Sequence, residues 1–558
     1  MLKTKIISSQ TKAFIDEKIE SFKECKKITA LGGEVVSFQV LYTDEDAPRL
    51  PFRPLTGVTL AGKLSEYATL RDLRNVPVDR PVKPDNFDAQ YLRTEPGIYP
   101  DILTPIRYGG KVCPAPNKLR SLWVDIEIPK DFSGKTELTV TLALDEKDIK
   151  CENTVQIEVI SANLPEGELM FTQWFYPDCL ASYYNVAAYS ERHWQIIDNF
   201  VSLAAKRGRN VLYTPLLTPF LNVSPPFYRN NAQLVSVTVR DGKYEFDFSR
   251  VERWVEICNK YGIKFFEISH FFRQHSADCA AHVYATKNGE EIRLFGWETE
   301  ATNPEYIAFV RALLTAFIDY MKARGDDGRC IYHICDEPDL TTLEQYKTVK
   351  DAVSDLLTDY KTIDALSDFD FYKLGILKHP VPTTTHAEAF IDARVPDLWV
   401  YYACCELVDY SNCYVAMPLW RTRSLGFQLY KYENITGFLH WGYNYYNNRA
   451  SGDAINPYID LGGEDWVPAG DTFMVYPAED GTPVESVRMM ALTEALQDYH
   501  AMKLAERYYS HAEVVEAIEK VLGEPITFRR CAHSEEEMLK IRSTVNEMIA
   551  KAIKPTKR

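Results

Sequence analysis

The pattern of apolar residues changes once along the chain, near Leu164-Pro165-Glu166-Gly167, and this change constrains the fold more than any other feature. Before it, apolar and polar residues alternate in short segments that Gly, Pro and Asp separate. A period of two is typical of strands that bury one face. After it, short apolar segments alternate with segments of helical length. We therefore expect differently built domains on the two sides of this point.

Regular spacing of the alternating segments predicts a β-sandwich for residues 1–162. Clear examples lie at residues 33–42, 122–129, 136–144 and 153–160. No cluster of catalytic residue types falls in this part of the chain. We expect it to support a catalytic domain rather than to carry one.

Strand-plus-helix units follow over residues 165–510, which we expect to form a (β/α)8 barrel of the TIM type. The segments of helical length lie at residues 191–206, 251–261, 304–324 and 343–358. A doubly wound sheet is the alternative, but the sequence has no Gly-rich nucleotide loop to support it. Amphipathic segments at 512–521 and 535–553 predict a helical appendage over residues 511–558.

Composition restricts the classes of partner. The formal net charge of −16 argues against nucleic acid or an anionic membrane surface, because both attract basic proteins. No apolar segment has the length of a signal peptide or a membrane span, so we expect a cytoplasmic protein. The 12 cysteines contain no Cys-x-x-Cys pair, so we expect reduced thiols, no metal and no cofactor. The sequence does not indicate the oligomeric state.

Two adjacent acids, Asp336 and Glu337, follow the apolar segment 330–335 and precede Pro338. Pro338 disfavours continuation of the strand, and a barrel places its active site at the carboxyl ends of its strands. The two carboxylates repel each other as ions, which favours one ionised and one protonated group. These acids are the candidate catalytic residues, and a solvated strand exit is the alternative that remains open.

Aromatic and amide side chains at other predicted strand exits are candidate walls of a substrate pocket, because they combine flat faces with hydrogen-bonding groups. These residues are Trp174, Tyr402, Trp441, Tyr443 and Asn444. Core packing explains each of them equally well when it is taken alone.

For the histidines, structural roles are the better interpretation. His333 lies within the predicted strand, and we expect it to be a core histidine with hydrogen-bond partners. His270, His275, Asp278 and His282 have no standard spacing of metal ligands, so we expect them to be loop residues.

The segment around Asp336 resembles the His-Ile-Ser-Asp-Glu-Pro signature of glycoside hydrolase family 123 and the related domain-of-unknown-function 4091 proteins, with Cys335 in place of the serine. Further similar segments lie at residues 178–184, 214–219, 268–272, 294–297, 400–402, 437–444, 470–477 and 496–499. After His270 the family continues with a Gln-Trp-Gly stretch, which residues 273–279 do not contain. This departure predicts a different pocket wall and leaves the substrate preference open.

The resemblance implies an exo-acting, retaining glycosidase that releases terminal β-linked N-acetylgalactosamine from a small glycan. In that scheme the sugar's own 2-acetamido oxygen attacks C1, so the enzyme supplies no nucleophile. Carried over to this chain, Asp336 would accept the acetamido N–H and stabilise the oxazolinium intermediate. Glu337 would protonate the leaving oxygen and then activate water.

Other functions remain open from the sequence. The same fold serves β-N-acetylglucosaminidases and glycosidases for sugars without an acetamido group. A carbohydrate-binding protein without catalytic activity is the alternative from another functional class, because it would retain both the barrel and its aromatic side chains.

Overall fold

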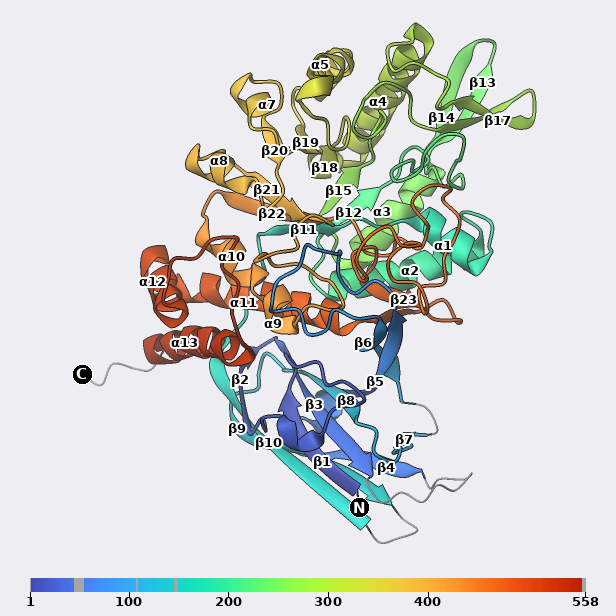
Figure 1. The fold of residues 1–558 in the computed structure, drawn as a ribbon. Helices are drawn as coiled ribbons and strands as arrows, with labels where there is room; N and C mark the ends of the chain where they lie inside the picture. The colour runs from blue at the N-terminus through green and yellow to red at the C-terminus, as the bar shows by residue number, and fades with distance from the viewer. Residues whose placement is uncertain (1, 45–54, 107–108, 145–148, 554–558) are drawn as a thin grey trace. The chain divides into compact units, whose positions relative to one another are not determined.

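The computed structural model describes residues 2–44, 55–106, 109–144 and 149–553, which form two compact units (Figure 1). One unit, here called the sandwich unit, consists of residues 1–167, 407–432 and 484–558. The other, the barrel unit, consists of residues 168–406 and 433–483. Each unit therefore contains more than one segment of the chain.

The described residues of the sandwich unit form two five-stranded sheets. The first has the order β1 (Leu2–Ser8), β3 (Val35–Asp44), β8 (Arg120–Glu127), β5 (Ala68–Val78) and β6 (Gly97–Pro105). The second has the order β2 (Lys27–Gly32), β10 (Ile149–Asn163), β9 (Gly134–Leu144), β4 (Thr56–Ala61) and β7 (Lys111–Val112). Their inner faces share one apolar core, to which β8 contributes Leu122 and Val124 and β9 contributes Leu138 and Val140. The predicted β-rich N-terminal part is confirmed.

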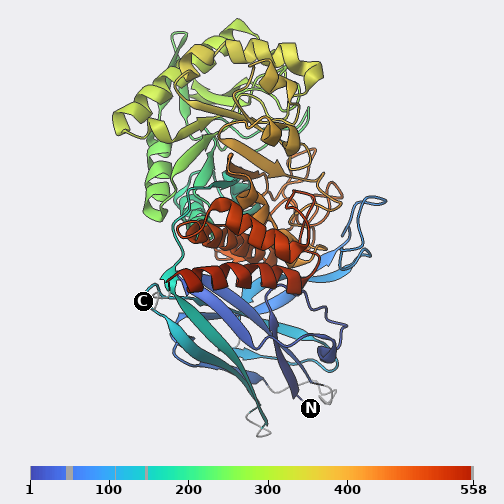
Figure 2. The ribbon, with the colours of Figure 1, turned by 90° about the vertical axis from the view of Figure 1, so that its left-hand side faces the viewer.

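Among the described residues of the sandwich unit, the α-helices are α9 (Leu419–Arg423), α10 (Leu425–Lys431), α11 (Val487–Ala505), α12 (His511–Leu522) and α13 (Glu535–Ile553). Trp123, on the outer face of β8, packs with Leu419 of α9 and Met490 of α11. Helix α13 contacts β2 and β10, and Figure 2 shows this red helix lying across the ends of the strands. The sequence predicts barrel for residues 165–510, whereas 407–432 and 484–510 group with the sandwich unit.

The barrel unit is built on eight parallel strands. Their order is β20 (His379–Val381), β19 (Lys361–Ala365), β18 (Cys330–Tyr332), β15 (Phe265–Ile268), β12 (Val211–Thr214), β11 (Met170–Gln173), β22 (Ile435–His440) and β21 (Leu398–Tyr402). The two end strands also approach each other, because Thr383, just after β20, forms a parallel bridge with Tyr401 of β21. The sheet is therefore a nearly closed barrel, which confirms the predicted eight-stranded barrel.

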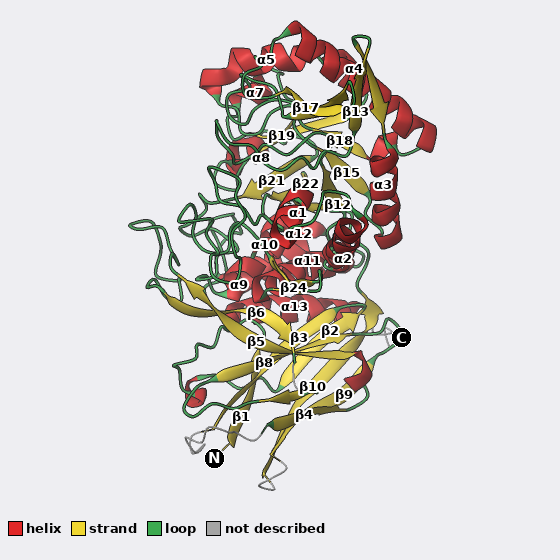
Figure 3. Cartoon of the chain, turned by 90° about the vertical axis from the view of Figure 1, so that its right-hand side faces the viewer, coloured by secondary structure: helices red, strands yellow, loops and turns green. Residues whose placement is uncertain are grey.

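Helices and a small second sheet surround these strands, and Figure 3 shows α3 and α4 along the outside of the barrel. The helices are α1 (Pro177–Tyr184), α2 (Glu191–Lys206), α3 (Ser249–Tyr261), α4 (Pro304–Arg324), α5 (Leu343–Asp351), α6 (Ser354–Leu357), α7 (Asp370–Lys373) and α8 (Ala387–Asp392). The second sheet contains β14 (Lys243–Asp247), β13 (Ser236–Arg240), β16 (Val283–Lys287) and β17 (Glu290–Phe295). A short pair, β23 (Val475–Pro477) and β24 (Pro483–Glu485), follows later in the chain.

Helix α4 illustrates how local sequence sets the start of β18. The Asn303 side chain accepts hydrogen bonds from the backbone N–H groups of Glu305 and Tyr306, and Pro304 occupies the first turn. Gly325, with φ of 74°, ends the helix in the left-handed conformation that glycine adopts without strain. The helix therefore ends at a defined residue, and β18 begins five residues after Gly325. None of the helices in the described ranges is long and apolar enough to cross a bilayer.

Candidate active site

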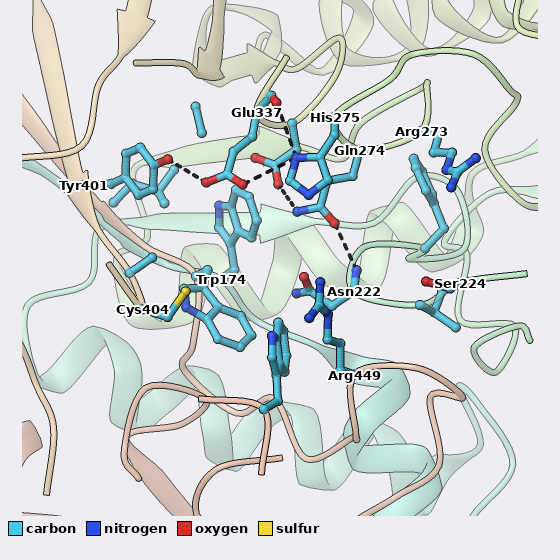
Figure 4. Close-up of a pocket in the computed structure, with 18 of the residues that line it drawn as sticks. Trp174, Asn222, Ser224, Arg273, Gln274, His275, Glu337, Tyr401, Cys404 and Arg449 are labelled. Carbon is cyan, nitrogen blue, oxygen red and sulfur yellow. Dashed lines mark hydrogen bonds and ion pairs between the residues drawn. The ribbon is translucent and has the colours of Figure 1, made fainter. Parts of the chain in front are cut away.

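A cavity of about 310 Å³ lies at the carboxyl ends of the barrel strands (Figure 4). Its walls come from the loops after seven of the eight strands or from their last residues, as expected for an active site in this architecture. The lining residues include Trp174, Asn222, Gln274, His275, Asp336, Glu337, Tyr401 and Trp441.

Asp336 and Glu337 face the same cavity because the backbone leaves strand geometry between them. Glu337 has a φ of 49°, in the left-handed region. Its N–H donates to the carbonyl of Ala365 at 3.0 Å, and the carbonyl of Asp336 accepts from the N–H of His275 at 2.7 Å. In a regular strand, neighbouring side chains point to opposite faces. The strained turn therefore brings two adjacent acids to one substrate site.

Asp336 is almost fully buried, with 3% of its surface exposed. Its Oδ2 accepts a hydrogen bond from Nε2 of Gln274 at 2.7 Å. Within the described residues, its Oδ1 has no hydrogen-bond partner. Burial and then the charge of Glu337 raise the pKa of Asp336 well above the ordinary aspartate value. A buried carboxyl oxygen without a hydrogen-bond partner favours a ligand that supplies a hydrogen-bond donor.

Glu337 occupies a different environment. Its side chain is 37% exposed. Oε1 accepts a hydrogen bond from the Tyr401 hydroxyl at 2.6 Å, and Nδ1 of His275 lies 3.6 Å from Oε2. Burial and then the charge of Glu337 raise the pKa of Tyr401, so this hydroxyl keeps its proton and remains a donor. Glu337 is thus oriented and still accessible to a leaving group and to water.

A network of buried ionisable groups lies beneath the acid pair. His333 contacts Glu267 Oε1 through Nε2 at 2.8 Å and Asp364 Oδ1 through Nδ1 at 3.2 Å, and all three side chains are fully buried. Burial alone disfavours the imidazolium, but the hydrogen bonds and charges of Asp364 and Glu267 raise the pKa of His333 to about 9. A positive charge is therefore fixed below the cavity.

The same network connects to the cavity wall. Glu267 accepts hydrogen bonds from Nε1 of Trp174 at 2.7 Å and from the Thr172 hydroxyl at 2.7 Å. Asp364 accepts one from the Tyr346 hydroxyl at 2.7 Å. These bonds fix the indole of Trp174 in the orientation in which it lines the cavity.

His270, His333 and Asp364 bring three potential metal-ligand atoms within 4.8 Å of one another. Both ring nitrogens of His333 are already engaged by carboxylates, so these hydrogen bonds account for the grouping. We therefore assign these three residues to the hydrogen-bonded network rather than to a metal site.

The structure brings together four of the residues that the sequence identified as candidates. Asp336, Glu337, Trp174 and Trp441 all line the cavity. Nε1 of Trp441 donates to Asp471 Oδ2 at 2.9 Å, which fixes the ring in the wall.

The other three candidates lie outside the cavity lining. Tyr402 packs its ring against Phe438 at 4.9 Å. The Tyr443 hydroxyl donates to a helix carbonyl at 2.9 Å, and Asn444 bonds the backbone of Tyr176 through both side-chain atoms. Successive side chains alternate along β21, and Tyr401 is the one that faces the cavity.

Two further contacts come from the loop that departs from the family pattern, residues 273–279. Gln274 bonds Asp336, and His275 approaches Glu337; the sequence predicts a pocket wall from this loop but only a loop role for His275 itself. Phe272 and Cys335 form a parallel bridge that holds this loop beside the acids. The sequence signal for a loop at the cavity is that residues 273–279 follow a predicted barrel strand. This signal does not identify which residues of the loop contact the acids.

Comparisons with known proteins identify a family and a similar fold. A model of the family described as glycoside hydrolase 123, catalytic domain, matches residues 174–505. Among solved structures, a family 123 glycoside hydrolase from Clostridium perfringens, described for glycolipid glycan hydrolysis, has a TM-score of 0.73 at 16% identity, covering 99% of this chain and 98% of that one. A β-glucuronidase from Parabacteroides merdae has a TM-score of only 0.32 at 11% identity, covering 84% and 51%. No curated protein sequence matched.

Proposed function

We propose that this chain, which belongs to glycoside hydrolase family 123, is a retaining exo-glycosidase that releases terminal β-linked N-acetylgalactosamine by substrate-assisted catalysis. One observation carries the proposal: the adjacent acids have unequal environments. Asp336 is buried with an unfilled acceptor, whereas Glu337 is accessible and oriented by Tyr401. This is the division of roles that the mechanism requires.

Asp336 is placed to position the substrate's acetamido group. Its Oδ2 is held by Gln274, which leaves Oδ1 to accept the acetamido N–H. That hydrogen bond turns the acetamido oxygen toward C1 and polarises it as the nucleophile. As the oxazolinium ion forms, its positive charge develops beside the carboxylate, which stabilises the transition state more than the ground state.

The acid pair works with one shared proton. In the empty cavity, burial favours the proton on Asp336. The substrate N–H and the developing cation favour the Asp336 anion, so the proton resides on Glu337 when the bond breaks. Glu337 donates it to the leaving oxygen while the acetamido oxygen bonds C1. The Glu337 carboxylate then takes a proton from the water that reopens the oxazolinium ring, which regenerates the pair.

The shape of the cavity supports exo action on a single terminal sugar. Its volume of about 310 Å³ is near the lower end of the range for small-molecule sites. Trp174 and Trp441 offer aromatic faces for the sugar ring. Because the Clostridium perfringens relative is described for glycolipid glycans, the glycan of a glycolipid is a substrate to include in assays.

The test compares nitrophenyl β-glycosides of N-acetylgalactosamine, N-acetylglucosamine and galactose, with and without a thiazoline that mimics the oxazoline. We expect turnover of the N-acetylgalactosaminide, strong inhibition by the thiazoline and negligible turnover of the galactoside. Preference for the glucosamine sugar would reassign the specificity and keep the mechanism. Preference for the galactoside, or indifference to the thiazoline, would contradict substrate assistance.

A further inference from the structure

His270 is a buried histidine that no step of the proposed mechanism uses. It follows β15, has no exposed surface, and its Nε2 lies 4.0 Å from Oδ1 of Asp336. Within the described part of the chain, neither of these two atoms has a hydrogen-bond partner. Two unpartnered polar atoms that face each other in a buried site are uncommon, because each is costly by itself.

The backbone holds the two residues in this relation. The segments after β15 and β18 run side by side, with a parallel bridge between Phe272 and Cys335. The N–H groups of Phe271 and Phe272 both donate to the carbonyl of Ile334, at 3.3 and 3.2 Å. The Nε2–Oδ1 distance therefore depends on the side-chain torsions of His270 and Asp336.

The surroundings of His270 determine which of its nitrogens carries a proton. Its ring lies 4.2 Å from that of His333. Burial and then the charge of His333 lower the pKa of His270 well below the ordinary histidine value, so the ring is neutral. The Tyr213 hydroxyl lies 3.2 Å from Nδ1. If this hydroxyl donates to Nδ1, the single ring proton is on Nε2 and points at Asp336.

We propose that His270 is a positioning residue for Asp336: its Nε2–H donates to Oδ1 in the substrate complex and, with Gln274 on Oδ2, holds the carboxylate plane against the acetamido N–H. The inference rests on the proposed function of the same site. Oδ1 has two lone pairs, so it accepts from His270 and from the substrate together. Tyr213 selects the tautomer and is the outer member of the arrangement.

Other charged groups around Asp336 also shift its pKa. Glu337 and Asp364 raise its pKa, and His333 lowers it. The charge of His333 is shared with Glu267 and Asp364, which bond both of its nitrogens. A neutral donor from His270 therefore adds stabilisation of the Asp336 anion that no other described group supplies to Oδ1.

The test uses three variants of the full chain and one control, assayed on nitrophenyl N-acetyl-β-galactosaminide across pH. His270→Leu removes the donor, and we expect kcat to fall about 10- to 100-fold with little change in KM. His270→Gln restores an N–H near the position of Nε2 and should recover part of that loss. Tyr213→Phe should give a smaller loss of a few-fold, because both tautomers of His270 then become populated.

The acid limb of the pH profile separates positioning from a merely structural role. Loss of a donor to the anion raises the pKa of Asp336, so the limb should move to higher pH in His270→Leu and less in Tyr213→Phe. His193 is the matched control: it is equally buried, and its two ring nitrogens bond backbone groups of Tyr189 and Pro177. His193→Gln should lower the melting temperature without moving the limb.

Three results would overturn the inference. The first is an acid limb of the pH profile that stays in place in His270→Leu. The second is a kcat of His270→Gln no higher than that of His270→Leu. The third is a loss of kcat across the variants that is proportional to their loss of melting temperature. If the wild type hydrolyses none of the aryl N-acetylglycosides, the proposed function fails instead. A crystal structure of the wild type at alkaline pH then decides: an Nε2–Oδ1 hydrogen bond supports the contact, and an open gap contradicts it.

Discussion

Two buried clusters of charge, one in each unit, are built in opposite ways. In the sandwich unit, an arginine cluster consists of Arg423, Arg542, Glu34, Glu494 and Asp498. Arg423 bonds Asp498 at 2.6 Å and Glu494 at 2.8 Å, and Arg542 bonds Asp498 at 2.9 Å as well as Glu34. Every carboxylate in this cluster has a guanidinium partner, and forked pairs of this kind satisfy both ions.

Asp336 is as deeply buried but lacks such a partner. In the described part of the chain, no guanidinium or ammonium group forms an ion pair with it, and the only hydrogen-bond donor to its carboxyl group is the neutral amide of Gln274. Composition of the barrel unit does not explain this, because Asp178 in the same unit is paired with Arg229 at 2.7 Å. Carboxylates that hold the fold together are neutralised, whereas the one placed for chemistry keeps an unused acceptor.

The largest expected effect is that of Asp336→Asn. The substitution removes the anion that stabilises the oxazolinium ion, so kcat/KM should fall by about 10³-fold or more with good and poor leaving groups alike. The melting temperature should stay the same or rise, because a buried, unpaired carboxyl has been replaced by a neutral amide. Assays on nitrophenyl and disaccharide substrates, with a thermal melt, check both statements. Wild-type activity in this variant would end the proposal.

Glu337→Gln should depend strongly on the leaving group. Loss of the general acid should slow an unactivated disaccharide by about 10²- to 10⁴-fold, whereas dinitrophenolate needs little protonation and its release should be much less affected. The slope of log kcat/KM against leaving-group pKa measures this difference. An equal loss across the series would show that Glu337 is not the acid.

A substitution in the arginine cluster should reduce stability and leave activity unchanged. Arg542→Met leaves Glu34 buried without its partner and should reduce the free energy of unfolding by about 3–5 kcal/mol. Activity per folded molecule should not change, since the substitution lies in the sandwich unit. Denaturant unfolding and activity at matched folded fraction provide the measurement. If Arg542→Met lost activity without losing stability, the two clusters would not have the different roles described above.

His333 predicts a pH dependence of stability. Its pKa is raised from 6.5 to about 9, so its stabilising contribution is complete below pH 6.5 and is lost as pH rises through about 9. The loss should amount to about 3 kcal/mol at most and should be absent in His333→Gln. For His193, burial lowers the pKa to about 4, so its contribution is lost at acid pH instead. Melting curves from pH 5 to 10 should separate the two residues.

Sequence patterns predict the parts of this molecule that local chemistry controls. The bounds of α2 and α4 follow from their periodicity and end signals, and Pro338 locates the turn that brings the acid pair to the cavity. Barrel geometry then places that turn at the active end.

Other parts depend on contacts that the sequence does not show. All five residues of β21 are buried, so no alternation indicates that Tyr401 rather than Tyr402 faces the cavity. Helix α11 is buried on nearly every side, so its sequence has no single apolar stripe that would indicate the unit to which it belongs. The contacts of Gln274 and His270 with Asp336 join positions more than 60 residues apart along the chain.

The central claim is that the nucleophile belongs to the substrate. Its most direct test is a series of nitrophenyl β-galactosaminides with N-acetyl, N-fluoroacetyl, N-difluoroacetyl and N-trifluoroacetyl groups. Each fluorine weakens the acyl oxygen as a nucleophile and leaves the leaving group unchanged. We predict that kcat/KM falls steeply, by about 10²-fold or more across the series. A flat series would show that the attacking atom comes from the enzyme or from water, and would contradict the account.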